Sequence, residues 1–114
     1  LPNEKCLEFV VNQILSNAIK YTKRGSVAIY MDDREEKTLV IADTGIGIAP
    51  EDIPRVFEKG YTGYNGRYDK RSTGIGLYLC QRVLKRLSHT IRITSEPGQG
   101  TQVYIGLDTV KVEP

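Results

Sequence analysis

Three polar side chains share one flank of the first helix that the sequence predicts. With Ile14 as zero and about 100° per residue, the apolar stripe spans roughly −40° to 140°. On the same scale Gln13, Asn17 and Lys20 fall near roughly −100°, −60° and −120°. The amide oxygen of Asn17 could bind Mg²⁺, and an ammonium group one turn later could meet phosphate charge. A solvated helix face would show the same pattern.

A carboxylate and two glycines follow the second predicted strand. Asp43 ends an apolar run, and Gly45 and Gly47 come directly after it in the segment Asp43-Thr44-Gly45-Ile46-Gly47-Ile48. A partly buried carboxylate can accept a hydrogen bond from an exocyclic amine, and glycine lets the backbone approach a flat ring closely. An ordinary strand-end turn is the alternative. The dinucleotide-binding fingerprint is excluded, because no G-x-G-x-x-G occurs and no long helix follows directly.

A second glycine-rich segment precedes the second long helix. It reads Ser72-Thr73-Gly74-Ile75-Gly76-Leu77, so unpaired N–H groups and the helix dipole would face whatever fills that end. This arrangement suits an anion, although a flexible helix entry capped by Ser72 or Thr73 is the alternative. A Walker-type phosphate loop is excluded, because the segment has no Gly-Lys-Ser/Thr ending.

Residues 59–73 show neither hydrophobic period and predict a long loop of the length typical of lids. Basic and aromatic side chains are interleaved in it, namely Lys59, Arg67, Lys70 and Arg71 with Tyr61, Tyr64 and Tyr68. A cationic loop beside an anion site could close over polyphosphate and exclude water. The aromatics could instead indicate single-stranded nucleic acid, but a net charge of only +2 disfavours nucleic acid as a partner.

The hydrophobic periods predict the elements that position these residues. We expect helices over 4–23 and 77–87, a short helical piece over 50–58, and strands over 27–31, 38–43, 90–95 and 101–107. Since strands and helices do not alternate regularly, the fold class is α+β: a two-layer sandwich with a mixed, mostly antiparallel sheet and helices on one face. His89, the single histidine, follows a helix and reads as a turn residue.

Length and composition limit the class of protein. A chain of 114 residues fits one domain, which we expect to span residues 1–114. No apolar run approaches the roughly 18 residues that cross a bilayer, so no membrane contact is expected from this piece. Cys6 and Cys80 lack metal-ligand spacing and read as small core residues of a reducing compartment. The abrupt start at Leu1 indicates a fragment of a longer chain.

Together, these motifs resemble the ATP-binding catalytic domain of bacterial sensor histidine kinases, the Bergerat or GHKL fold. The likeness covers nearly the whole chain: an N-box at 13–21, glycine boxes at 43–48 and 72–77, an F-box at 56–61 and a closing Gly-x-Gly-Thr at 98–101. The lid text at 59–67 and the helix start at 74–80 further resemble intramembrane-sensing kinases of Gram-positive bacteria that respond to bacitracin or cationic antimicrobial peptides.

Carried over position by position, the resemblance implies that Asp43 accepts a hydrogen bond from the adenine amine. Asn17 would bind Mg²⁺, Phe57 would anchor the lid, and the catalytic set would be Gln13, Lys20 and Arg67. The residues implied to bind ATP are Asn17, Lys20, Tyr21, Asp43, Gly45, Gly47, Ile48, Phe57, Lys59, Gly60, Tyr61, Arg67, Thr73, Gly74, Gly76, Leu77 and Thr101.

One position departs from the related ATPases of this fold. They place a water-activating glutamate one turn before the metal-binding asparagine, and this chain has Gln13, which cannot take a proton. The resemblance therefore implies a protein-histidine kinase. It would transfer the γ-phosphoryl group to a histidine on a separate dimerisation domain, for relay to a response regulator, from the cytoplasmic part of a bacterial membrane protein. An ATPase of the same fold and a non-catalytic nucleotide-binding or docking module are the alternatives.

Overall fold

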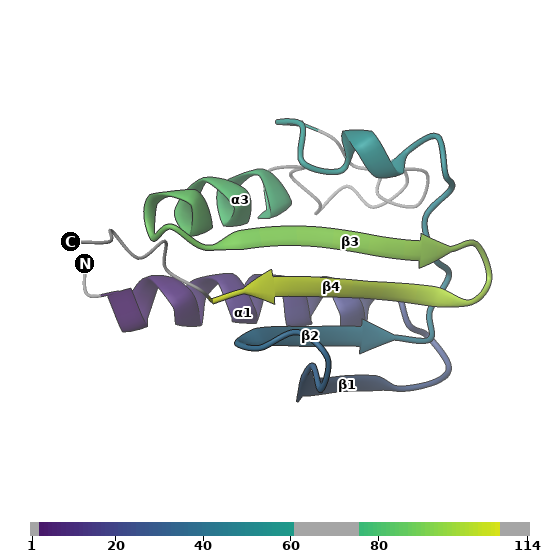
Figure 1. Ribbon diagram of the computed structural model, residues 1–114. Coiled ribbons are helices and arrows are strands. Elements are labelled where there is room, and N and C mark those ends of the chain that lie inside the picture. Colours follow the sequence, from purple (N-terminus) through teal and green to yellow (C-terminus); the bar gives the residue numbers. More distant parts are fainter. Residues whose placement is uncertain (1–2, 61–75, 108–114) are drawn as a thin grey trace.

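The computed structural model describes residues 3–60 and 76–107, and their strands form one four-stranded sheet (Figure 1). The order is β1-β2-β4-β3, with bounds Val27–Met31 for β1, Thr38–Asp43 for β2, Thr90–Glu96 for β3 and Gly100–Gly106 for β4. Every pairing among these strands is antiparallel, so the mixed character that we expected is not seen in the described part of the sheet.

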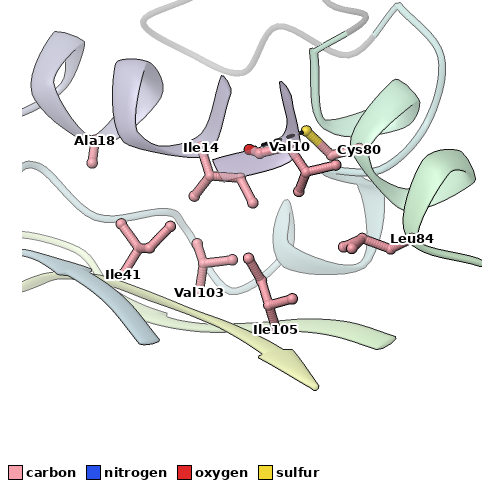
Figure 2. Close-up of a cluster of buried hydrophobic side chains, with 8 residues drawn as sticks. All are labelled: Val10, Ile14, Ala18, Ile41, Cys80, Leu84, Val103 and Ile105. Carbon is pink, nitrogen blue, oxygen red and sulfur yellow. Dashed lines mark hydrogen bonds between the residues drawn. The ribbon is translucent and has the colours of Figure 1, made fainter. Parts of the chain in front are cut away.

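Two α-helices of the described part of the chain cover one face of this sheet. They are α1, Asn3–Lys20, and α3, Gly76–Arg86, and they also pack against each other. Figure 2 shows both helices on the same side of the strands, with the apolar side chains between the layers. The predicted α+β two-layer sandwich is therefore confirmed.

The main cluster of buried apolar side chains among the described residues is built from both layers (Figure 2). Helix α1 contributes side chains at i, i+4 and i+8, and the sheet contributes alternating positions of two strands, as expected for one buried face of each element. The fully enclosed members of this cluster are Val10, Ile14, Ala18, Ile41, Cys80, Leu84, Val103 and Ile105.

Helix α1 differs from the prediction at its C-terminal end. We expected it to reach residue 23, but it ends at Lys20: the Thr22 N–H donates to the Ile19 carbonyl at 3.3 Å, in a tighter turn, and the Tyr21 carbonyl accepts the N–H of Ile46 at 3.3 Å. The apolar stripe is also narrower than predicted, since Ile19 is 61% exposed. The chain thus leaves the helix after Lys20, and the Tyr21 carbonyl binds the distant segment at Ile46.

The segment between β2 and the long loop is less helical than predicted for 50–58. A 3₁₀ turn, η1, spans Ile53–Arg55, with Pro54 near its start. It is flanked by turns, such as the one in which the Asp52 N–H donates to the Ala49 carbonyl at 2.9 Å. Proline removes a backbone donor, so the hydrogen-bonded run stays short.

The connection from α3 to β3 is a tight turn. Ser88 adopts a positive φ of 64°, and the His89 N–H donates to the Leu84 carbonyl at 2.8 Å. His89 lies directly before β3, which confirms the expectation that it is a turn residue.

The two cysteines occupy different environments. Cys80 is buried and its thiol lies 3.8 Å from the Val10 carbonyl oxygen, whereas Cys6 is only partly buried, and both thiols are free (Figure 2). Burial raises the pKa of the Cys80 thiol from its ordinary value of 9.0 to about 12, since desolvation disfavours the thiolate.

A pH-dependent stability difference is expected from Cys80. Above pH 9 the unfolded chain loses the thiol proton while the folded chain keeps it, so this contribution is complete below pH 9 and is lost as the pH rises to about 12. Urea unfolding from pH 8 to 11 should show a shallower loss of stability for Cys80→Ala than for the unmodified chain. Parallel curves would contradict the burial of a neutral thiol, and Cys6→Ala serves as the control.

Candidate functional site

Three polar side chains form a row across the sheet at one end of three neighbouring strands. Asp43 on β2 is directly opposite Thr101 on β4, and Thr101 is directly opposite Ser95 on β3. Side chains alternate along a strand, so this row shares the helix-covered face with Ile41 and Val103 of the core. The row therefore lies where the apolar core gives way to polar groups.

The carboxylate of Asp43 is held in place by the turn that follows it. The Gly45 N–H donates to Asp43 Oδ1 at 2.8 Å, and the side chain is partly buried. An ionised carboxylate only accepts hydrogen bonds, so its remaining lone pairs can receive a donor such as an exocyclic amine. Asp43 therefore presents an acceptor at the end of β2, and its role toward adenine stays a prediction.

The two glycines after Asp43 are required by the protein's own backbone. A Cβ on Gly45 would overlap the Tyr21 carbonyl oxygen, and a Cβ on Gly47, whose φ is +77°, would overlap the carbonyl oxygen of Glu96. We expected these glycines to make room for a ring. The structure instead shows them letting the loop pack between the end of α1 and the β3–β4 turn.

Ser95 is the residue at this site that the sequence did not reveal. Its hydroxyl accepts the Ile48 N–H at 2.8 Å, donates to the Gly100 carbonyl at 2.8 Å, and lies 2.8 Å from Thr101 Oγ1. It thus joins the glycine-rich loop to both strands of the closing hairpin. Its position opposite Thr101, across the turn 97–99, was the available signal, but that requires the register of the hairpin to be known.

The polar flank of α1 faces the start of α3. Gly76 is the first residue of α3, and the Gln13 Oε1 lies 3.2 Å from the place that a Cβ on Gly76 would occupy. Asn17, partly buried, follows Gln13 by one turn on this flank. The structure therefore brings together Gln13 of the N-box and Gly76 of the second glycine box, so the described start of α3 lies beside an amide of the α1 flank.

Lys20 and Lys59 each lie near an aromatic ring. Lys20 Nζ is 5.4 Å from the centre of the Tyr21 ring, and Lys59 Nζ is 5.9 Å from the centre of the Tyr78 ring on α3. Lys59 is exposed, so one end of the predicted lid places a cation next to α3. Lys20 is the last residue of α1, and Lys59 lies next to Tyr78 of α3.

The remaining predicted residues are placed only in part. Phe57 is partly buried beside the fully buried Val56, Gly60 is exposed with a φ of +89°, and Leu77 packs against the core. The packing of Leu77 leaves its backbone, not its side chain, for a ligand at the start of α3. Other predicted site residues lie outside the described residues, namely Tyr61, Arg67, Thr73 and Gly74.

A comparison with protein families decides the assignment. Residues 3–111 match the family described as histidine kinase-, DNA gyrase B- and HSP90-like ATPase. The chain belongs to this ATPase family. The resemblance to the ATP-binding domain of sensor histidine kinases, inferred from the motifs, is confirmed.

Curated relatives of this ATPase domain are sensor proteins. It is 42% identical over 102 residues to the sensor histidine kinase YxdK of Bacillus subtilis, covering 87% of this chain and 31% of YxdK. It is 40% identical to the sensor protein BceS of the same organism and 39% identical to the sensor protein kinase GraS of Staphylococcus aureus, in each case over 89% of this chain and 30% of the relative. The chain therefore spans about a third of the length of these relatives.

Solved structures show the same fold. The mycobacterial sensor histidine kinase MprB superposes with a TM-score of 0.72 at 28% identity, covering 89% of this chain and 70% of that one. The full-length kinase ShkA in complex with AMPPNP superposes with a TM-score of 0.71 at 25% identity, covering 88% of this chain and 20% of that one. Neither helix among residues 3–60 and 76–107 is long and apolar enough to cross a membrane.

The donor set of this ATPase domain suits a magnesium ion bound mainly through a nucleotide. Within the described ranges, no three His, Cys, Asp or Glu side chains lie together as a metal cluster. Mg²⁺ in phosphate-binding enzymes uses one or two protein ligands, with phosphate oxygens and water supplying the others. The partly buried amide of Asn17, one turn after Gln13 on the polar flank of α1, fits that role.

Proposed function

We propose that this domain binds ATP with Mg²⁺ and donates the γ-phosphoryl group to a histidine on a separate dimerisation domain of the same kinase. A response regulator would then receive the group from that histidine. The observation that carries the proposal is the arrangement of two polar regions: the Asp43–Thr101 row at the sheet end and the α1 flank beside the N-terminus of α3.

The base would be recognised at the sheet end. One carboxylate oxygen of Asp43, Oδ1, already accepts the Gly45 N–H, and the second oxygen is suited to accept a hydrogen bond from the exocyclic amine of adenine. Thr101 would support the same ring, and the partly buried side chains of Tyr21 and Ile48 would pack against it. The AMPPNP bound by the related kinase ShkA, an ATP analogue, supports this class of ligand.

The polyphosphate would lie between α1 and α3. Lys20 and the N–H groups at the start of α3 supply positive charge, and Asn17 would hold Mg²⁺, which neutralises phosphate charge when bound. The lid and the second glycine box are proposed to complete the phosphate site, through Lys59, Gly60, Tyr61, Arg67, Thr73 and Gly74. Phosphoryl transfer needs little covalent chemistry from the protein, so positioning and charge neutralisation are the main tasks.

Gln13 favours transfer to a protein acceptor over hydrolysis. Its amide can orient a neighbouring group but cannot take a proton from water, and no acid stands at that position of α1. In the transfer, the bond from the γ-phosphorus to its bridging oxygen breaks and a bond to an imidazole nitrogen forms. The unprotonated imidazole nitrogen supplies the lone pair for the new bond, ADP leaves with the electron pair of the broken bond, and the proton on the other ring nitrogen is released to water.

The direct test combines this domain with ATP, Mg²⁺ and a separately prepared dimerisation domain of the full-length kinase. We expect label from γ-³²P-ATP on the acceptor domain, stable in alkali and lost in acid, as phosphohistidine is. An acceptor domain whose histidine is replaced by alanine should take up no label. If phosphate were released steadily without any acceptor, and Gln13→Ala abolished that release, the ATPase alternative would replace this proposal.

The context of the domain is part of the proposal. The curated relatives are sensor kinases about three times longer than this chain, so we propose that it is the cytoplasmic catalytic part of a membrane-anchored bacterial sensor. In that setting other regions of the full-length kinase would sense the stimulus and carry the acceptor histidine. The domain's own task would be to present the γ-phosphate.

A further inference from the structure

The hydroxyl of Ser95 has all of its hydrogen-bonding capacity in use. A hydroxyl carries one proton and can accept two hydrogen bonds. Ser95 Oγ has three partners, each at 2.8 Å: the Ile48 N–H, the Gly100 carbonyl oxygen and Thr101 Oγ1. Three bonds fill one donor and two acceptor places.

These partners fix the direction of every proton. The Gly100 carbonyl can only accept, so it receives the Ser95 proton, and the Ile48 N–H can only donate. The remaining place on Ser95 is an acceptor, so Thr101 must donate to it. The Thr101 hydroxyl therefore donates its single proton in the hydrogen bond to Ser95.

A threonine hydroxyl in this state offers only lone pairs to a ligand. The neighbouring side chain across the strand pair, Asp43, is a carboxylate and also offers only lone pairs. Two adjacent acceptors suit a ring that carries an amine at this point. A ring with a carbonyl oxygen at this point would place that acceptor against the acceptor oxygens of Asp43 and Thr101. No hydrogen bond could form between them, so these polar groups would be left unpaired.

We propose that Ser95 is a positioning and specificity-determining residue, which holds Thr101 as a hydrogen-bond acceptor and so selects 6-amino over 6-oxo purine nucleotides. The inference rests on the proposed function, because it assigns the base to the Asp43–Thr101 row. Ser95 itself acts through Thr101. It lies one strand further from Asp43, at the edge of the described sheet.

A purely structural role for Ser95 predicts a different result. Its bonds to Ile48 and Gly100 tie the glycine-rich loop to the β3–β4 hairpin, and their loss would loosen the site for every nucleotide. Selection through Thr101 instead changes the ratio of two affinities. ATP and inosine triphosphate separate these effects, because their bases differ at the 6-position and the adjoining ring nitrogen.

The experiment measures the affinities of ATP and inosine triphosphate, each with Mg²⁺, by calorimetry. We expect the unmodified domain to prefer ATP, and Ser95→Ala to reduce this preference by about threefold to tenfold, the range that one neutral hydrogen bond implies. Ser95→Thr, which keeps a hydroxyl on a strand position that favours β-branched residues, should restore the preference.

A double-mutant cycle shows whether Ser95 acts through Thr101. Thr101→Val alone should reduce the preference for ATP, and adding Ser95→Ala to it should not reduce the preference further. Equal losses of affinity for both nucleotides in Ser95→Ala, or the same change of ratio with and without the Thr101 hydroxyl, would overturn the inference. If the unmodified domain bound neither nucleotide, the proposed function would fail as well.

Discussion

Replacing Gly100 by alanine should lower the free energy of unfolding by about 2 to 5 kcal/mol. Gly100 has a φ of +120°, and a Cβ there would overlap the carbonyl oxygen of Asp43 on the adjacent strand. The strained backbone costs about 1 to 2 kcal/mol and forced repacking about 1 to 3 kcal/mol. Because backbone of the central strand pair blocks the Cβ, no side-chain rotation relieves the overlap.

The neighbouring glycine of the same turn provides the matched control. Gly98 also has a positive φ, +78°, but nothing lies within 4 Å of its Cβ position. Urea unfolding of Gly98→Ala should therefore show only the backbone strain, about 1 to 2 kcal/mol. Equal losses for the two variants would mean that the strands β2 and β4 separate readily at Asp43, and that the row at the sheet end is not rigid.

The sequence predicted the elements well wherever a buried face repeats. The spacing of Val10, Ile14 and Ala18 identified α1, because packing against one core imposes that period. The apolar run in 38–43 and the alternation in 101–107 identified the two central strands. The resemblance placed Asp43 and Thr101 among the residues implied to bind ATP, and the structure pairs them directly across β2 and β4.

The features that the sequence did not predict depend on contacts between distant segments. The Tyr21 carbonyl, directly after α1, binds the distant Ile46 N–H, and the contribution of Ser95 comes from bonds to Ile48 and Thr101. None of these follows from local periodicity. They become visible only when the hairpin register places residues from three strands in one row.

The roles of glycine show the same limit. Close approach of the backbone to a flat ring was the reason inferred from the sequence for Gly45 and Gly47, whereas close packing on the protein's own backbone is the reason that the structure gives. The two reasons are compatible, since a loop that packs closely on Tyr21 and Glu96 also holds Asp43 in place. Sequence identified the positions, and the structure supplied the physical cause.

Asp43→Asn should weaken ATP binding at least about tenfold while leaving the fold intact. A hydrogen bond to a charged acceptor contributes about 1.5 to 3 kcal/mol, and about 1.4 kcal/mol corresponds to a factor of ten. The asparagine oxygen can still accept the Gly45 N–H, now made to Asp43 Oδ1 at 2.8 Å, so the turn keeps its bond. That bond commits the oxygen, so the amide NH₂ replaces the second acceptor and faces the adenine amine with a donor.

Calorimetry with ATP and Mg²⁺ measures this loss, and thermal unfolding without nucleotide shows whether the fold is kept. Asp33→Asn is the matched control, because it removes the same charge from an exposed position in the β1–β2 turn and should leave the affinity unchanged. If both variants lost the same amount of affinity for ATP, long-range charge and not a hydrogen bond would explain the role of Asp43. If neither variant lost affinity, Asp43 would have no role in binding adenine. Loss of affinity in Asp43→Asn but not in Asp33→Asn would place the adenine amine at the end of β2. Both variants remove one carboxylate charge, so only a local contact with the ligand can make their effects differ.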